Sequence, residues 1–305
     1  MPLTLDAARR ARSLLTPHIR STPVLSLAAG ELSDVGCTLK LECLQHTGAF
    51  KVRGALVAAL KGDRRRALVT ASGGNHGLGV AFAAQVLDVP ATVVLPESAP
   101  ESKAEKLRRR GALVVRHGAV WDDAWEHAVL LSQSQSARLI HPFADEDVLL
   151  GQATIGLELA EQAPDVDTWV IPIGGGGLIG GVAFALKSLR PDVRIVGVEP
   201  TGAPTLYESV RAGKLVTLPI IQTAAGTLAP RRSAEINLRL VSEFVDDIVL
   251  VSDEQMFDAA RWLWSECAVP AELAAAAATA AIRAGTVGGR SLGAIVCGTG
   301  TAGMA

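Results

Sequence analysis

The sequence predicts an α/β fold of two lobes, each a mostly parallel, twisted sheet flanked by helices. Short apolar or β-branched runs alternate with alanine-rich helical patterns from about residue 67 to the end, as repeated strand–helix units do. A chain of 305 residues is long enough for two modest cores. No long polar linker and no sequence repeat interrupts the series. Two packed α/β lobes place a cleft between them, where we expect a ligand to bind.

The first lobe is predicted at residues 61–141, as a small α/β domain. Its helical segments carry apolar residues at helical spacing, as Trp121, Trp125 and Ala128 do in the last of them. The predicted strands are 67–72, 91–96, 112–117 and 137–142, and the predicted helices are 76–87, 100–110 and 121–135.

The second lobe is predicted to be a larger domain made of residues 1–60 and 142–305. A helix at 146–162 opens its series, and strands and helices then alternate. The other predicted helices are 178–189, 203–212, 253–266 and 271–285, and the predicted strands are 168–173, 194–200, 247–252 and 292–298.

The charge balance disfavours two classes of partner. Lysine and arginine total 29 against 31 acidic residues, a net charge of −2, so no field of one sign indicates a nucleic acid or a membrane surface. The uncharged run 168–186 contains Pro172 and six glycines, which a strand, a loop and a helix explain better than a membrane span.

The cysteines and the N-terminus predict the compartment. The cysteines show neither metal-like nor disulfide spacing, and the first residues lack the pattern of a signal peptide. We therefore expect a cytoplasmic protein. The four cysteines are Cys37, Cys43, Cys267 and Cys297.

A run of four glycines, Gly174–Gly177, lies between a predicted strand and a predicted helix. Glycines there allow positive φ and let backbone N–H groups close on an anion beside the helix N-terminus, which suits a phosphate. A second interpretation stays open. Gly175, Gly177 and Gly180 match G-x-G-x-x-G, and Glu199 follows about 20 residues on, as in a nicotinamide-dependent oxidoreductase.

A second glycine turn follows the strand at 67–72. Ser72, Gly73, Gly74 and Asn75 would expose successive backbone N–H groups and a side-chain amide at a helix start, which suits a carboxylate. Standing alone, the turn would be explained by helix capping. Two such turns in one chain instead favour one site for a phosphate and one for a carboxylate.

Lys51 begins a predicted helix in the stretch "LQHTGAFKVRGALVAAL". Most such lysines are solvated residues of a first turn. Here the positive end of the helix dipole and the ring of Phe50 favour the neutral amine, which can act as a nucleophile. Lys51 shares its helical face with Ala55 and Ala58, small residues that we expect to leave room for a flat ring.

Seven motifs in order extend this pattern over nearly the whole chain: "KLECLQHTGAFKVRGA", "ASGGNHG", "LIHPF", "IPIGGGGLIGG", "VGVEPTGAPTL", "VDDIVLVSDE" and "IVCGTG". The chain resembles the fold type II pyridoxal-phosphate enzymes, and among them the serine/threonine dehydratase and serine racemase group. The resemblance implies pyridoxal 5'-phosphate in the cleft between the lobes, a small amino-acid substrate and a homodimer.

The resemblance also implies roles for single residues. Lys51 resembles the Schiff-base lysine with Phe50 beside the ring, Asn75 the amide that bonds the pyridine 3'-oxygen, and Cys297 the neutral partner of the pyridine nitrogen. Glu272 falls where the family has a glutamate near the ring. As bare residues, Cys297 could equally be a core cysteine and Glu272 a helix cap. The resemblance assigns binding of the cofactor phosphate to Gly174, Gly175, Gly176 and Gly177. It assigns binding of the substrate carboxylate to Ser72, Gly73, Gly74 and His76.

The implied reaction is β-elimination from a small β-hydroxy amino acid, L-threonine or L-serine, giving a 2-oxo acid and ammonia. Racemases of the group carry a serine where this chain has Gly73, which disfavours racemisation. Their divalent cation is held at positions resembling Glu199, Ala203 and an aspartate, but Thr205 replaces the aspartate, which disfavours a tight Mg or Ca site. Alternatives left open are a racemase, a β-replacement enzyme, the nicotinamide enzyme and a non-catalytic binding homologue.

Overall fold

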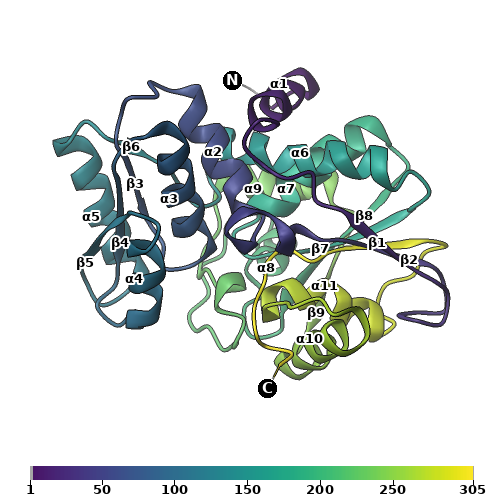
Figure 1. Cartoon of the computed structure of the whole chain (residues 1–305). Helices are drawn as coiled ribbons and strands as arrows, with labels where there is room; N and C mark the ends of the chain where they lie inside the picture. The colour runs from purple at the N-terminus through teal and green to yellow at the C-terminus, as the bar shows by residue number, and fades with distance from the viewer. Residues whose placement is uncertain (1–2, 305) are drawn as a thin grey trace.

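The computed structural model describes residues 3–304, and within them the strands form two sheets, of six and of four strands (Figure 1). In the large sheet every neighbouring pair is parallel except β1 and β2, so the carboxyl ends of five strands share one edge. Its order is β1 (Val24–Leu27), β2 (Cys37–Lys40), β10 (Leu292–Ile295), β7 (Thr168–Pro172), β8 (Arg194–Pro200) and β9 (Asp247–Val251).

Helices cover both faces of the large sheet (Figure 1). The middle strands β7 and β10 are buried along their whole length, which is why their sequences are continuous apolar runs rather than alternating ones. Helices on one side are α6 (Glu146–Gln162), α7 (Gly177–Leu189) and α9 (Glu235–Phe244), with α1 (Leu5–Leu15) packed on α6; on the other side lie α10 (Asp253–Cys267) and α11 (Leu273–Arg283).

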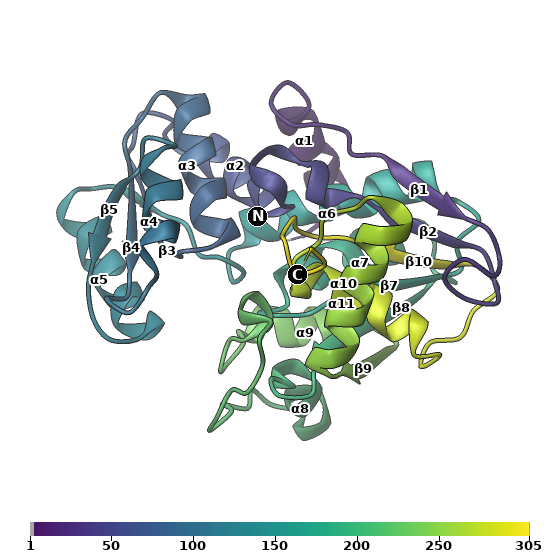
Figure 2. The ribbon, with the colours of Figure 1, turned by 60° about the horizontal axis from the view of Figure 1, so that its bottom comes forward.

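The small sheet is parallel throughout and lies apart from the large one in both ribbon views (Figure 2). Its core strand alternates: Val69 and Ala71 face α5 (Trp121–Ser134), while Leu68 faces α3 (Asn75–Leu87) and α4 (Glu101–Arg108). Its order is β5 (Leu113–Arg116), β4 (Ala91–Leu95), β3 (Leu68–Ala71) and β6 (Arg138–Leu139).

Helix α2 (Lys51–Lys61) lies between α3 and α6 and is buried on all sides from Val52 to Leu60. The expectation that Ala55 and Ala58 leave room beside Lys51 was therefore wrong, because both residues are fully buried. Small residues serve close helix packing instead: a Cβ on Gly54 would lie 2.8 Å from the Val148 carbonyl oxygen.

The predicted strands and helices of both series are present, with ends shifted by a few residues. The run 168–186 forms β7, a glycine turn and most of α7, and within residues 3–304 no helix is both long and apolar enough to cross a membrane. Because α1, α2 and α6 share one hydrophobic core with the α3 face of the small sheet, the division into domains at 61 and 142 stays a prediction. The elements that were not predicted are α1, β1, β2, α9 and the short helices at 42–44, 46–48 and 226–228.

Candidate active site

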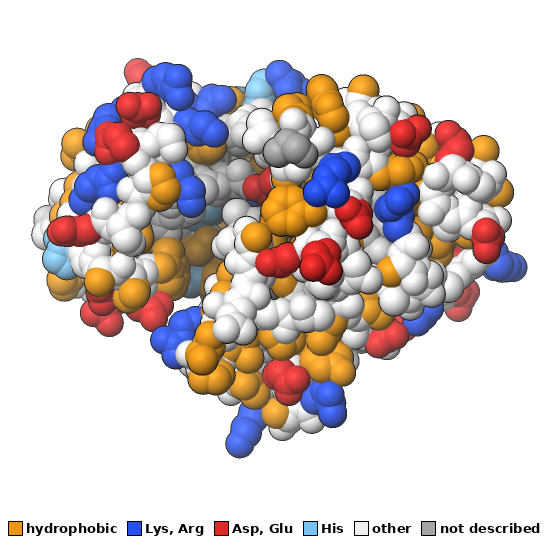
Figure 3. Space-filling model, turned by 90° about the horizontal axis from the view of Figure 1, so that it is seen from below, with side chains coloured by type: hydrophobic (Ala, Val, Ile, Leu, Met, Phe, Trp, Pro, Cys, Tyr) orange, Lys and Arg blue, Asp and Glu red, His pale blue; other side chains and the backbone are white. Residues whose placement is uncertain are grey.

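The loops that follow strands of both sheets meet at a hollow of the molecule. Parallel strands bring the loops after β7 and β10 to one edge of the large sheet, and the loops after β3 and β6 to one edge of the small sheet. Side chains then join the two edges: the Asn75 amide donates to the Glu272 carboxylate at 2.7 Å, across 197 residues of sequence. Figure 3 shows the hollow between the part that carries the small sheet and the rest of the chain.

Lys51 is the first residue of α2, and its amine lies at this junction. Nζ donates to the Pro142 carbonyl oxygen at 2.7 Å and lies 5.1 Å from the centre of the Phe50 ring. Burial disfavours the charged ammonium and lowers the pKa of Lys51 from 10.5 to about 8, although Cys297 and Glu272 partly oppose the shift. A substantial fraction of this amine is therefore neutral near neutral pH.

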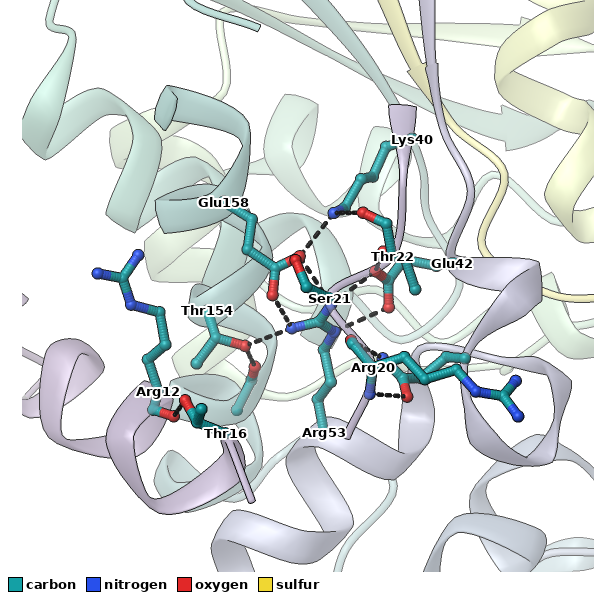
Figure 4. A network of polar contacts seen from close by, with 12 residues as sticks. Arg12, Thr16, Arg20, Ser21, Thr22, Lys40, Glu42, Arg53, Thr154 and Glu158 are labelled. Carbon is teal, nitrogen blue, oxygen red and sulfur yellow. Dashed lines mark hydrogen bonds and ion pairs between the residues drawn. The ribbon is translucent and has the colours of Figure 1, made fainter. Parts of the chain in front are cut away.

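A buried ionic network fixes the start of α2 (Figure 4). Arg53 donates to both carboxylate oxygens of Glu42 at 2.8 Å and to those of Glu158 at 2.7 and 2.9 Å, and Lys40 donates to Glu158 at 2.5 Å. Burial alone would raise the pKa of Glu42, but Arg53 and Lys40 outweigh it and hold that pKa below its ordinary value. Because Arg53 is two residues from Lys51, the network holds the helix end that carries the amine.

The glycine run after β7 has no room for side chains. Gly176 has φ +88°, and a Cβ on Gly175 would lie 2.4 Å from the Phe143 ring. The Gly175 carbonyl accepts hydrogen bonds from Ser233 at 2.9 Å and Asn237 at 2.7 Å. With that carbonyl engaged and the first N–H groups of α7 lacking helical partners, the turn is a cradle for an anion.

The turn after β3 leads directly into α3. Ser72 Oγ accepts a bond from the Gly74 N–H at 3.3 Å, and Asn75 is the first helical residue. The His76 ring is buried rather than exposed in the turn, and its Nε2 lies 3.2 Å from the Ile140 carbonyl oxygen. Burial and then the Lys51 charge lower the pKa of His76 to about 3, so this ring is neutral.

Glu272 and Cys297 lie on the edge of the large sheet. Glu272 occupies the N-cap position of α11, but its carboxylate makes no cap bond and is directed at Asn75 instead. Burial raises its pKa to about 7, with Asn75 and Lys51 opposing. Burial, followed by the charge of Glu272, raises the pKa of Cys297 well above that of an ordinary thiol, so the sulfur stays protonated. Gly298 permits this approach, because a Cβ there would lie 2.4 Å from a Glu272 oxygen.

The sequence profile of the family described as pyridoxal-phosphate dependent enzyme matches residues 15–298. The chain belongs to this family.

Similar proteins span most of the chain. It is 39% identical over 284 residues to the L-threonine ammonia-lyase of Thermotoga maritima, covering 92% of this chain and 71% of that protein. It is 36% identical over 306 residues to the phenylserine dehydratase of Ralstonia pickettii, covering 97% and 93%. The structure of maize serine racemase superposes with a TM-score of 0.93 at 33% identity, covering 98% and 94%.

The residues present fit the pyridoxal phosphate that this family binds. The crowded glycine cradle after β7 offers N–H groups to a phosphate, and Lys51 offers an amine of lowered pKa. Asn75 offers a donor for a ring oxygen, and the protonated thiol of Cys297 offers an uncharged partner for a ring nitrogen. Bound there, the cofactor supplies an electron sink for a carbanion at the substrate Cα.

Membership in this family overturns the nicotinamide interpretation of the glycine run, and the geometry agrees. Gly180 lies inside α7, and the buried Glu199 carboxylate accepts the N–H groups of Leu206 and Tyr207 at 2.9 and 2.7 Å. Glu199 therefore caps the start of α8 (Thr205–Ala212), where Thr205 donates to the Pro230 carbonyl oxygen and Ala203 lies buried nearby. Within residues 3–304 no group of three or more His, Cys, Asp or Glu side chains could hold a metal ion.

Several residues at the junction were missed or underrated in the sequence. Pro142 and Phe143 lie in the quoted "LIHPF" motif, but nothing in it indicates contact with Lys51 or with the glycine cradle. Thr227 lies in the loop after α8, where no motif marks it. Its carbonyl oxygen crowds Gly174, and its side chain bonds to Glu272. Arg231, in the same loop, donates to the Leu218 carbonyl oxygen.

Proposed function

We propose that the protein is a pyridoxal-phosphate-dependent ammonia-lyase that removes water from L-threonine or L-serine and releases a 2-oxo acid and ammonia. The observation that supports this most is the Lys51 amine, of lowered pKa, held between a phosphate cradle and a second anion-binding turn. The L-threonine ammonia-lyase of Thermotoga maritima supports the same assignment. Small β-hydroxy amino acids carry the carboxylate, the amine and the leaving hydroxyl that this reaction requires.

Each residue has a role in this proposal. The backbone N–H groups of the turn at Ser72–Asn75 bind the substrate carboxylate. The neutral Lys51 amine accepts the proton from the substrate Cα as general base. Glu272 holds the Asn75 amide in place, and Phe50 keeps water from the lysine amine. Gly174–Gly177 hold the cofactor phosphate.

Racemisation is the second candidate, since serine racemases are among the similar proteins. It requires a proton donor on the face of Cα opposite Lys51. Gly73 has no side chain to supply one, and a Cβ there would lie 3.2 Å from Leu95 and 3.3 Å from Lys103. We therefore favour elimination.

Other features remain expectations. We propose a large domain of residues 1–60 and 142–305, a small domain of residues 61–141, a homodimer, a cytoplasmic location and no required cation. Size-exclusion chromatography with light scattering tests the dimer.

The first experiment is a visible absorption spectrum of the purified protein before and after borohydride reduction, with mass mapping of the reduced peptide. We expect a yellow protein, an adduct on Lys51 and ammonia release from L-threonine or L-serine. Lys51→Ala should abolish the reduced adduct and the ammonia release. Chiral analysis of the remaining substrate measures racemisation. A colourless protein that takes up no added pyridoxal phosphate contradicts the proposal.

A further inference from the structure

Four aromatic side chains form a continuous row beside Lys51, and we name this row the aromatic wall: Trp121, Trp125, His141 and Phe143. The two tryptophan rings stack at 5.6 Å with an angle of 13°. Trp125 and His141 meet edge to face at 4.6 Å and 73°, and His141 and Phe143 at 4.6 Å and 86°. None of these residues has a role in the proposed reaction.

The aromatic wall runs from one anion-binding turn to the other. At one end the Trp121 indole donates to the Ala71 carbonyl oxygen at 2.9 Å, directly before the turn at Ser72–Asn75. At the other end the Phe143 ring fills the space that a Cβ on Gly175 would need. Pro142, between His141 and Phe143, accepts the hydrogen bond of the Lys51 amine. The wall therefore flanks the space where carboxylate, amine and phosphate sites meet.

The rings of the aromatic wall are only partly used in the packing of α5, where Trp125 contacts the edge of the core beneath the helix. The helix buries Ala124 and Ala128 against the small sheet, whereas Trp121 remains 36% exposed and Trp125 is half-buried. His141 and Phe143 are also only half-buried. Figure 3 shows hydrophobic and histidine side chains inside the hollow. Burial lowers the pKa of His141 to about 4, aided by the Lys51 charge, so its ring is neutral and adds apolar surface.

We propose that the aromatic wall is a subsite for an aryl group on the substrate Cβ, so that the enzyme deaminates 3-aryl β-hydroxy amino acids. This inference rests on the proposed lyase function. With 3-phenylserine, Lys51 takes the Cα proton, the Cβ–O bond breaks and water leaves. Water later replaces the nitrogen, so that 3-phenylserine gives phenylpyruvate and ammonia without an oxidant. The flat phenyl ring lies against the wall, with edge and face contacts like those among the rings themselves.

The kinetic test compares kcat/KM for 3-phenylserine, L-threonine and L-serine in the holoenzyme. We expect kcat/KM for 3-phenylserine to equal or exceed that for L-threonine. Trp125→Leu keeps an apolar residue for packing but removes the ring, and should lower the ratio of 3-phenylserine to L-threonine kcat/KM by about tenfold or more. Trp125→Phe should restore most of the ratio. Trp264→Leu is the matched control, because Trp264 is exposed on α10, and should change nothing.

A binding test does not depend on turnover. L-phenylalanine lacks the leaving hydroxyl, so its dissociation constant, measured by calorimetry against that of L-alanine, should favour phenylalanine by about tenfold in the wild type but not in Trp125→Leu. Ammonia from L-threonine or L-serine with no phenyl preference in either assay overturns the subsite alone. So does an equal loss for all substrates in Trp125→Leu. No ammonia from any of the three substrates overturns the lyase function and the subsite together.

Discussion

The lowered pKa of Lys51 makes a quantitative prediction about how the protein takes up its cofactor. Covalent capture of pyridoxal phosphate requires the neutral amine. With a pKa of about 8, about a quarter of the Lys51 amine is neutral at about pH 7.5. With an ordinary pKa near 10.5, only about one amine in a thousand would be neutral. The difference in reactive amine is about two orders of magnitude. The capture rate should therefore rise with pH and level off above about pH 8.

The assay mixes cofactor-free protein with pyridoxal phosphate and follows visible absorbance over a range of pH. Borohydride reduction and peptide mapping assign the adduct to Lys51, and Lys51→Ala measures the background from other amines. A rate that still increases about tenfold per pH unit near pH 9 would refute the reasoning, because burial would then not have lowered the pKa. The shift has a definite sign: the ammonium is the form that burial disfavours, so lowering the pH protonates the amine and slows capture.

Three further predictions concern the frame of the site. Arg53→Met leaves the buried Glu42 without its ion-pair partner and Glu158 with Lys40 alone, and should lower the free energy of unfolding by about 3–5 kcal/mol in urea titrations. Arg65→Ala, at an exposed pair, should change it little. Gly175→Ala places a Cβ in the Phe143 ring and should weaken pyridoxal-phosphate binding in a fluorescence titration; Gly288→Ala, with open space around it, should not. Gly73→Ser needs shifts of a few tenths of an ångström and should raise the D-serine formed from L-serine in a chiral assay.

The regular elements of the fold were predictable because their local signals agree. The helix at 146–162 was predicted with the bounds it has, since Asp145 accepts the N–H groups of Asp147 and Val148 and two acidic residues follow in the first turn. Strands β1 and β2 were missed because each mixes apolar with polar residues, Ser26 in β1 and Thr38 and Lys40 in β2, instead of forming a continuous apolar run like that of β10. Helix α9 was missed although Asn237, Leu238, Leu240 and Val241 form a buried side of the helix.

Only those parts of the site that are formed by the backbone could be predicted from the sequence. Glycine turns between a strand and a helix indicate anion-binding sites in the sequence, because backbone N–H groups bind the anion there. The contacts that complete the site join residues far apart in sequence: Lys51 and Pro142 are 91 residues apart. Side-chain reasoning about Ala55 and Ala58 failed for a related reason. A helical face of small residues can accept a ring or another helix, and only the packing of α3 and α6 decides between them.

The electrostatics of the site follow one pattern: the arginine and lysine of the buried network are paired with carboxylates away from the Lys51 amine, and burial keeps most of the titratable neighbours of that amine neutral. The network around Arg53 contains two cations and two carboxylates, so it holds α2 without adding net charge near Lys51. The His76 and His141 rings have pKa values lowered to about 3 and about 4, and the Cys297 thiol has a raised one. Glu272, with a pKa of about 7, is the neighbour that titrates near neutrality. Above that pKa its charge favours the Lys51 ammonium, but desolvation outweighs this effect and still leaves the Lys51 pKa at about 8, so the free amine that the proposed chemistry requires appears as the pH rises.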